Sequence, residues 1–229
     1  PRLDAYPVNA CIRGLFYASC IIDRHAFDAF PATGPGIIVM NHINFLEAPM
    51  LASFLFPRKL GALTKKENLD IPVYGYLGRM WNAIPIDRGG VDTGSFRACL
   101  DWIGSGGLLG LAPEGTRSKT GVLGRGKAGV AMLAIRAGVP VWPIAHWGGE
   151  SFWGNLKRLR RTPISIRIGA PFIIRPQGSM TKTVRQEITD EIMDQIARLM
   201  PEQYRGPYAE SCMNQARHLV PAESTPQEV

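Results

Sequence analysis

Short apolar runs alternate with segments of helical periodicity along most of the chain. The runs predict buried strands at 36–40, 60–64, 83–86, 108–112, 139–145 and 164–168. Between and after them, apolar residues recur three or four positions apart, which predicts helices at 48–56, 91–103, 127–137 and 184–199. Strands that alternate with helices are typical of an α/β domain with a mostly parallel central sheet covered by helices on both faces.

The two ends of the chain follow other patterns. Residues 10–22, ACIRGLFYASCII, are apolar except for Arg13 and are too short to span a bilayer. As a helix, this segment either lies in a membrane interface with Leu15, Phe16 and Ile22 inserted, or packs on the core of the domain. Residues 211–229 are polar and contain proline, which predicts a frayed tail.

Composition limits the classes of protein that remain. A chain of 229 residues is long enough for one large domain, and four cysteines without a CxxC pair argue against a disulfide scaffold or a structural zinc site. The net charge of +7 favours an anionic partner: a nucleic acid, an acidic membrane or a phosphorylated substrate. The basic run 157–161 contacts anionic headgroups or is a solvated loop.

One loop that follows a predicted strand carries a histidine and an acid. Pro49 belongs in the first turn of a helix, which places Glu47 at the helix start and His42 on the turn that leaves the strand. The turn can then fold the carboxylate onto the imidazole, and a carboxylate bonded to one ring nitrogen makes the other a general base. Alternatively, His42 caps the turn and the helix dipole favours Glu47.

Cationic and hydrogen-bonding groups follow other strands. Gly115 permits a tight turn after the strand at 108–112, and Thr116 and Arg117 supply donors suited to phosphate. Arg88 follows the strand at 83–86. Lys127 opens a predicted helix, where the positive end of the helix dipole disfavours a cation unless an anion is bound there. Each of these residues is also compatible with an ordinary polar surface.

Together these loops resemble the glycerolipid acyltransferases, the family of 1-acylglycerol-3-phosphate acyltransferase. The similarity covers about residues 34–171, and four motifs occur in the family's order. They are Asn41-His42 with Glu47; 64–67, Ile71-Pro72, Gly75 and 83–88; Pro113-Glu114-Gly115-Thr116-Arg117-Ser118; and 139–144, with 126–129 fitting a Lys-Gly segment between the last two.

The resemblance implies an enzyme of phospholipid biosynthesis. His42, supported by Glu47, would take a proton from a hydroxyl of a lysophospholipid, which attacks the thioester of acyl-CoA or acyl-carrier protein. The family places the acceptor and its phosphate on a set of matched residues: Arg88, Glu114, Gly115, Thr116, Arg117 and Lys127. Asn41 and Asn44 would support the pair, and no cofactor or metal is implied.

Two positions depart from the family pattern. The acid is normally Asp and here is Glu47, and the residue two after the histidine is normally Ser and here is Asn44. Alternatives are therefore a lipid-binding protein of the same fold with impaired catalysis, or acylation of another lipid acceptor; nucleic-acid binding rests on charge alone.

The resemblance also divides the chain and places it in the cell. We expect a membrane-docking segment at 1–30, the acyltransferase domain at 31–205 and a polar tail at 206–229. The expected location is cytoplasmic, peripheral on the inner face of the cell membrane.

Overall fold

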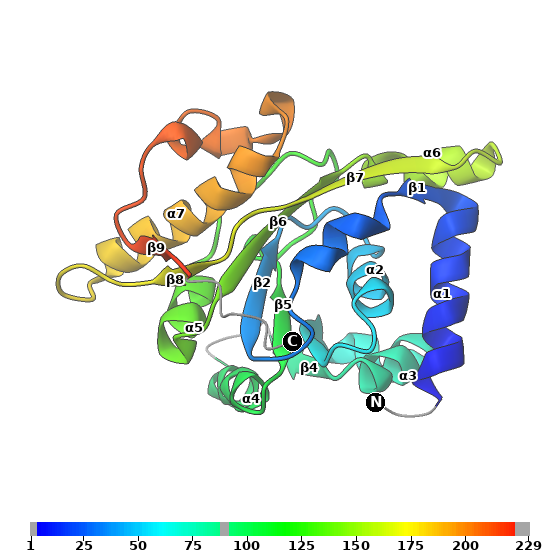
Figure 1. The fold of residues 1–229 in the computed structure, drawn as a ribbon, viewed down its shortest axis with the longest axis horizontal. Coiled ribbons are helices and arrows are strands. Elements are labelled where there is room, and N and C mark those ends of the chain that lie inside the picture. Colours follow the sequence, from blue (N-terminus) through cyan, green and yellow to red (C-terminus); the bar gives the residue numbers. More distant parts are fainter. Residues whose placement is uncertain (1–3, 88–91, 223–229) are drawn as a thin grey trace.

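The computed structural model describes residues 4–87 and 92–222, and their strands form one mixed sheet (Figure 1). The strand order is β1-β7-β6-β2-β5-β3-β4, and β8 pairs with β6 and β9. The strands are β1 (Cys20–Ile22), β2 (Gly36–Met40), β3 (Leu60–Lys65), β4 (Ala83–Ile86), β5 (Leu108–Leu111), β6 (Val141–Trp147), β7 (Thr162–Ile168), β8 (Phe172–Ile174) and β9 (Leu219–Pro221).

Most pairings in the sheet are parallel, as the sequence predicts. Strand β2 is parallel to both β5 and β6, and β3 is parallel to β4 and β5. Strand β7 runs antiparallel to β6 and parallel to β1, and β8 and β9 add further antiparallel pairs. The carboxyl ends of β2, β5 and β6 consequently meet at one edge, where ligands bind in open α/β sheets.

Helices cover both faces of the sheet (Figure 1). Ile37 and Val39 of β2 belong to the core beneath α4, α5 and α7, whereas Ile38 and Met40 belong to the core beneath α1 and α2. Successive side chains of a strand point to opposite faces, so a strand buried on both sides is apolar throughout. The helices are α1 (Ala5–Ser19), α2 (Glu47–Phe54), α3 (Pro72–Met80), α4 (Thr93–Gly104), α5 (Gly129–Ala137), α6 (Phe152–Lys157) and α7 (Lys182–Leu199).

The predicted helix at 10–22 is wrong in its bounds. Helix α1 starts at Ala5 and ends at Ser19, and residues 20–22 form β1, which joins the sheet beside β7. One face of α1 packs on the domain, where the buried Asn9 accepts a hydrogen bond from Trp81. The other face exposes Leu15, and none of the described helices is long and apolar enough to cross a membrane.

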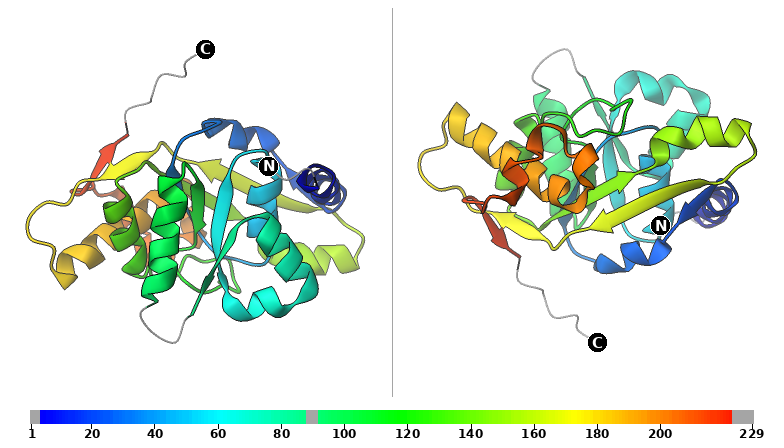
Figure 2. Two further views of the ribbon diagram at one scale, coloured as in Figure 1. Left: turned by 90° about the horizontal axis from the view of Figure 1, so that it is seen from below. Right: turned by 90° about the horizontal axis from the view of Figure 1, so that it is seen from above.

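The frayed tail predicted at 211–229, within the expected polar tail at 206–229, is wrong for residues 211–222. Cys212 and His218 are buried, and β9 pairs with β8 at the end of the sheet away from α1 (Figure 2). Arg198 of α7 donates to the carbonyl of Cys212, which ties this segment to the domain. The polar composition of this segment hid the few apolar side chains that hold it to the domain, such as Tyr208 and Cys212.

Smaller differences affect the ends of elements. Helix α4 begins at Thr93, where Asp92 accepts a hydrogen bond from the backbone N–H of Ser95, as expected of a cap. Helix α5 begins at Gly129 rather than at Lys127, so Lys127 lies on the preceding loop and the helix-dipole reasoning does not apply to it. Gly138 ends α5 in a left-handed conformation, with φ of 61°.

Candidate active site

A histidine and a glutamate form a close pair at the carboxyl end of β2. The strand ends at Met40, and α2 begins at Glu47, so His42 lies on the turn between them. Nδ1 of His42 lies 2.6 Å from Oε2 of Glu47, and the His42 side chain keeps 24% of its surface exposed. Because Nδ1 faces the carboxylate, Nε2 is the ring nitrogen available to a substrate.

The Glu47 carboxylate also organises the backbone of the turn. Its Oε1 accepts hydrogen bonds from the N–H groups of Ile43 at 2.8 Å and Asn44 at 2.7 Å. Burial raises the pKa of Glu47, but the hydrogen bond from His42, the charges of the two nearby histidines and the backbone N–H donors outweigh it. The pKa of Glu47 therefore lies below its ordinary value, and the group stays ionised beside His42.

The longer acid in place of the family's usual Asp does not separate the pair. Glu47 is the first residue of α2 and reaches back over the turn, so one oxygen contacts the ring of His42 while the other binds the loop backbone. The extra methylene of Glu47 is therefore accommodated without loss of its contact with His42.

A second histidine, His146 of β6, lies on the far side of Glu47. Its Nε2 donates to the carbonyl of Asn41 at 2.9 Å and lies 3.4 Å from Oε1 of Glu47. Burial lowers the pKa of His146 below its ordinary value, although the charge of Glu47 opposes the shift. The sequence reasoning missed this residue. The feature that could have indicated it is a histidine at the carboxyl end of a buried strand, where site residues collect in a parallel sheet.

Two asparagines fix the turn to β6 and to the segment that follows it. The amide of Asn41 donates to the carbonyl of His146 at 2.8 Å and accepts from its N–H at 2.9 Å. The amide of Asn44 donates to the carbonyl of Gly149 at 2.7 Å and accepts from the N–H of Leu46. Both residues thus occupy supporting positions around the pair.

Glu114, expected among the acceptor-binding residues, lies buried behind the turn between β2 and α2 that carries His42. It accepts hydrogen bonds from the N–H groups of His42 and Gly124, each at 2.8 Å. Burial raises the pKa of Glu114, and these two donors only partly offset the shift. The carboxyl group therefore joins the turn after β2 to the loop after β5, and it does not face solvent.

Part of the loop after β5 is exposed to solvent, and the loop adjoins His42. The N–H of Ser118 donates to the carbonyl of His42 at 2.6 Å, and Thr116 and Arg117 are exposed. Gly115 has φ of +65°, and a Cβ placed there would lie 2.9 Å from Nζ of Lys127. Lys127 thus lies over Gly115 on this loop, whereas Arg88 falls outside the described residues.

Comparison with known proteins identifies the family of this chain and agrees with its fold. The profile of the Acyltransferase family matches residues 22–147, more than half of the chain, and the chain therefore belongs to that family. The solved structure of the 1-acyl-sn-glycerophosphate acyltransferase of Thermotoga maritima superposes with a TM-score of 0.62, covering 85% of this chain and 78% of that one. At 21% identity that match shows a shared fold.

Among the curated relatives are 1-acyl-sn-glycerol-3-phosphate acyltransferases of plants and bacteria. The chloroplastic enzyme of Brassica napus is 35% identical over 118 residues, covering 50% of this chain and 33% of its own length. The enzyme of Pseudomonas aeruginosa is 31% identical over 122 residues, covering 52% of this chain and 46% of its own length. The chain thus spans between a third and a half of the length of these relatives.

The lowered pKa of Glu47 predicts a pH-dependent contribution to stability. The stabilising carboxylate is fully ionised above its ordinary pKa of 4.5 and is lost as the pH falls through the lower value of the folded state. We expect Glu47→Gln to lower the free energy of unfolding by about 1–3 kcal/mol at neutral pH. Urea unfolding should show this difference shrinking as the pH falls below 4.5, the ordinary pKa of the group.

The control for this measurement is Glu67→Gln, which changes an exposed carboxylate on the turn η2 (Lys66–Asp70). It should alter stability little at either pH. A wild-type advantage over Glu47→Gln that stays constant as the pH falls would contradict the ionised state assigned to Glu47.

Proposed function

We propose that the protein transfers a fatty acyl group from acyl-CoA or acyl-carrier protein to a hydroxyl of a lysophospholipid such as 1-acylglycerol 3-phosphate. The observation that carries the proposal is the 2.6 Å contact between Nδ1 of His42 and Oε2 of Glu47. It leaves the other ring nitrogen of His42 free to act as a base. Membership of the family and the names of the relatives support the same reaction.

The reaction follows from this pair. Nε2 of His42 takes the proton of the acceptor hydroxyl while the oxygen attacks the thioester carbonyl, and Glu47 stabilises the resulting imidazolium. Collapse of the tetrahedral intermediate breaks the carbon–sulfur bond, and the proton passes from His42 to the departing thiolate. The product is an ester, phosphatidic acid in the case of 1-acylglycerol 3-phosphate, and this exchange requires no redox group or metal.

The exposed loop after β5 is proposed to bind the phosphate of the acceptor. Thr116 and Arg117 offer hydrogen bonds, Lys127 adds charge, and Gly115 lets the loop turn beneath them. Arg88 is assigned to the same role by its motif alone. Glu114 takes part through the backbone of His42 rather than through the phosphate.

The acceptor and product of this reaction are lipids, so we propose that the protein works as a peripheral protein at the inner face of the cell membrane. The segment 10–22 was expected to dock there through Leu15, Phe16 and Ile22. Phe16 instead packs in the core, whereas Leu15 and Tyr17 of α1 are exposed and suit this role.

Replacing His42 by alanine should abolish acyl transfer while the fold survives. The loss of a general base lowers kcat by about 10²–10⁴-fold. Mass spectrometry of the lipid product from a panel of hydroxyl acceptors, each offered with acyl-CoA and with acyl-carrier protein, measures the activity. Wild-type-like turnover in His42→Ala, with an unchanged melting temperature, would exclude the proposed mechanism.

Two replacements of Glu47 should differ in rate: Gln, which keeps the size of the side chain, and Asp, which keeps its charge. Glu47→Gln loses the charge that supports the imidazolium, and its amide can donate to Nδ1 and impose the wrong tautomer, so kcat should fall about a hundred-fold or more. Glu47→Asp keeps the charge on a shorter side chain and should fall about ten-fold. Equal rates of the two variants would count against the role of the charge.

The phosphate site should be visible in the kinetics of Arg117→Ala. Loss of a charge-assisted contact should raise KM for a phosphorylated acceptor about 10–100-fold and change kcat less. The matched control is Arg136→Ala at the end of α5, an exposed arginine away from the catalytic turn. If Arg117→Ala raises KM equally for an acceptor without phosphate, the assigned contact is wrong.

A further inference from the structure

Helix α6 and the turn after it expose a compact group of apolar and basic side chains. This α6 tip consists of Trp153, Leu156, Lys157, Arg158, Leu159 and Arg160. Trp153 is 57% exposed and Leu159 is 95% exposed, which is unusual for side chains of their size. Figure 1 places α6 at the far end of β7, beyond the end of α1.

The conformation of the tip is fixed, although its side chains are in solvent. The N–H groups of Arg158 and Arg160 both donate to the carbonyl of Asn155, at 2.9 Å each. Leu159 has φ of 53°, in the left-handed region where helices usually end on Gly or Asn. The chain thus holds a fully exposed leucine at a position that favours a residue without an apolar side chain.

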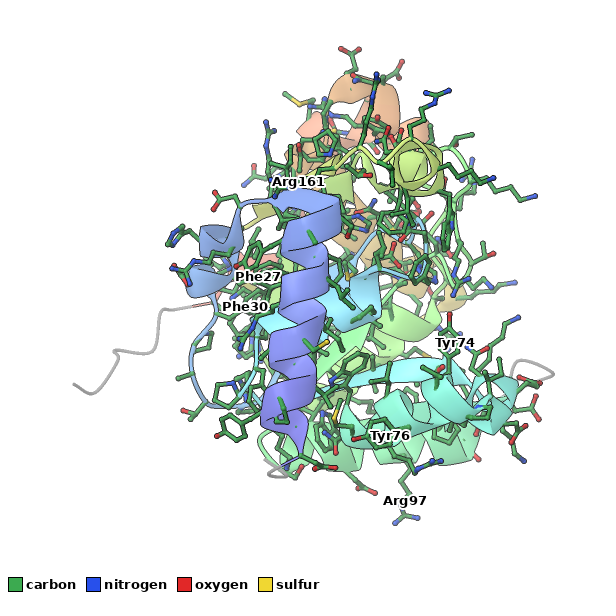
Figure 3. All side chains as sticks on the ribbon, turned by 90° about the vertical axis from the view of Figure 1, so that its right-hand side faces the viewer. Phe27, Phe30, Tyr74, Tyr76, Arg97 and Arg161 are labelled. Atoms are coloured by element: carbon green, nitrogen blue, oxygen red, sulfur yellow. The ribbon has the colours of Figure 1, made fainter. Side chains whose placement is uncertain are left out.

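The charges of the tip are available to a partner. Lys157, Arg158 and Arg160 are exposed, and none of them pairs with an acidic side chain within residues 4–87 and 92–222. Arg161 differs, because its guanidinium donates to the carbonyl of Cys20 beside the end of α1 (Figure 3). That contact anchors the base of the tip to β1, where Ile21 is also exposed.

The tip is joined directly to the catalytic turn. Phe45 stands between His42 and Glu47 in the sequence. Its ring stacks on that of Trp153, with ring centroids 5.4 Å apart. Phe45 also contacts Phe152, and Asn44 donates to the carbonyl of Gly149 just before α6. A surface that receives the α6 tip therefore lies close to the entrance of the active site.

We infer that the α6 tip is a membrane-docking surface for an anionic bilayer, with Trp153, Leu156 and Leu159 inserted among the headgroups and Lys157, Arg158 and Arg160 bound to lipid phosphates. Exposed tryptophan and leucine beside lysine and arginine are the combination that interfaces with acidic lipids select. The inference rests on the proposed function, because docking at this surface is useful to the protein when His42 acts on a lipid acceptor in the same membrane.

Two double variants test the tip, and both spare Trp153 because it packs on Phe45. Leu156→Ser with Leu159→Asn removes the apolar contacts and keeps a residue suited to positive φ, and Lys157→Gln with Arg158→Gln removes two charges. Their matched controls are Met213→Asn, a residue 75% exposed near the C-terminal end, and Lys182→Gln at the start of α7.

The first measurement is flotation with vesicles of phosphatidylcholine, with and without phosphatidylglycerol. Wild type and controls should bind the anionic vesicles at least about ten-fold better than the neutral ones, and each tip variant should lose about ten-fold or more of this binding. Equal wild-type binding to both kinds of vesicle, no wild-type binding to either, or tip variants that bind like wild type would overturn the inference.

A third variant tests the competing apolar surface on α3. Val73 there is 66% exposed, and Val73→Ser should leave flotation unchanged. Loss of binding in Val73→Ser with retention in the tip variants would place the docking surface on α3 instead.

The second measurement separates docking from catalysis. Acyl transfer to a short-chain lysophosphatidate in solution should be within about two-fold of wild type in the tip variants, whereas transfer to a long-chain acceptor presented in anionic vesicles should fall about ten-fold. A wild type that acylates neither acceptor would refute the proposed function, and flotation would still decide the docking surface. Equal losses on both acceptors would show that the tip acts on the active site and not on docking.

Discussion

The turn between β2 and α2 depends on one buried carboxylate, that of Glu47, which accepts hydrogen bonds from several donors. Glu47 accepts from the ring of His42 and from two backbone N–H groups, and a second imidazole lies 3.4 Å away. A charge buried this deeply is costly unless its hydrogen-bonding capacity is met, and here nearly every donor comes from the turn that the charge organises. The same contacts that keep Glu47 ionised therefore determine the path of the backbone and the orientation of the base.

The parallel sheet explains why these groups meet. β2, β5 and β6 are adjacent and parallel, so the residues that follow each of them collect at one edge, although they are distant in sequence. His42 follows β2, Glu114 follows β5, and His146 belongs to the end of β6. Asn41 locks the first and third of these strands together through paired hydrogen bonds with the backbone of His146.

Much of the fold could be predicted from the sequence because its strands are short and the central ones, such as β2 and β5, are buried on both faces. The strands at 36–40 and 83–86 were predicted with the bounds that the structure shows, since Asn41 and Asp87 directly follow them and mark their ends. The end of α1 could not be located, because the apolar run continues without interruption from the helix into β1. Local periodicity carries no information about the β7 strand that pairs with those last residues.

The site was predictable in part, for a similar reason. The pairing of His42 with Glu47 needs only a turn of known length, and Pro49 indicated where the helix had to start. The burial of Glu114 and the approach of His146 depend on which strands are neighbours, and the spacing of residues along one chain does not contain that order. Glu114 was consequently expected among the acceptor-binding residues, where its carboxylate would face a substrate.

The two buried glutamates illustrate how the donor count decides the state of an acid. Glu47 receives an imidazole donor and two backbone N–H groups, and its pKa falls although burial raises it. Burial raises the pKa of Glu114, and its two backbone N–H donors and the charge of His42 do not outweigh that effect. The anion consequently lies on the ring side of His42 and the more readily protonated acid on its backbone side. The ionised acid therefore contacts Nδ1 of His42, whereas the acid with the raised pKa is bound to the backbone N–H of the same residue.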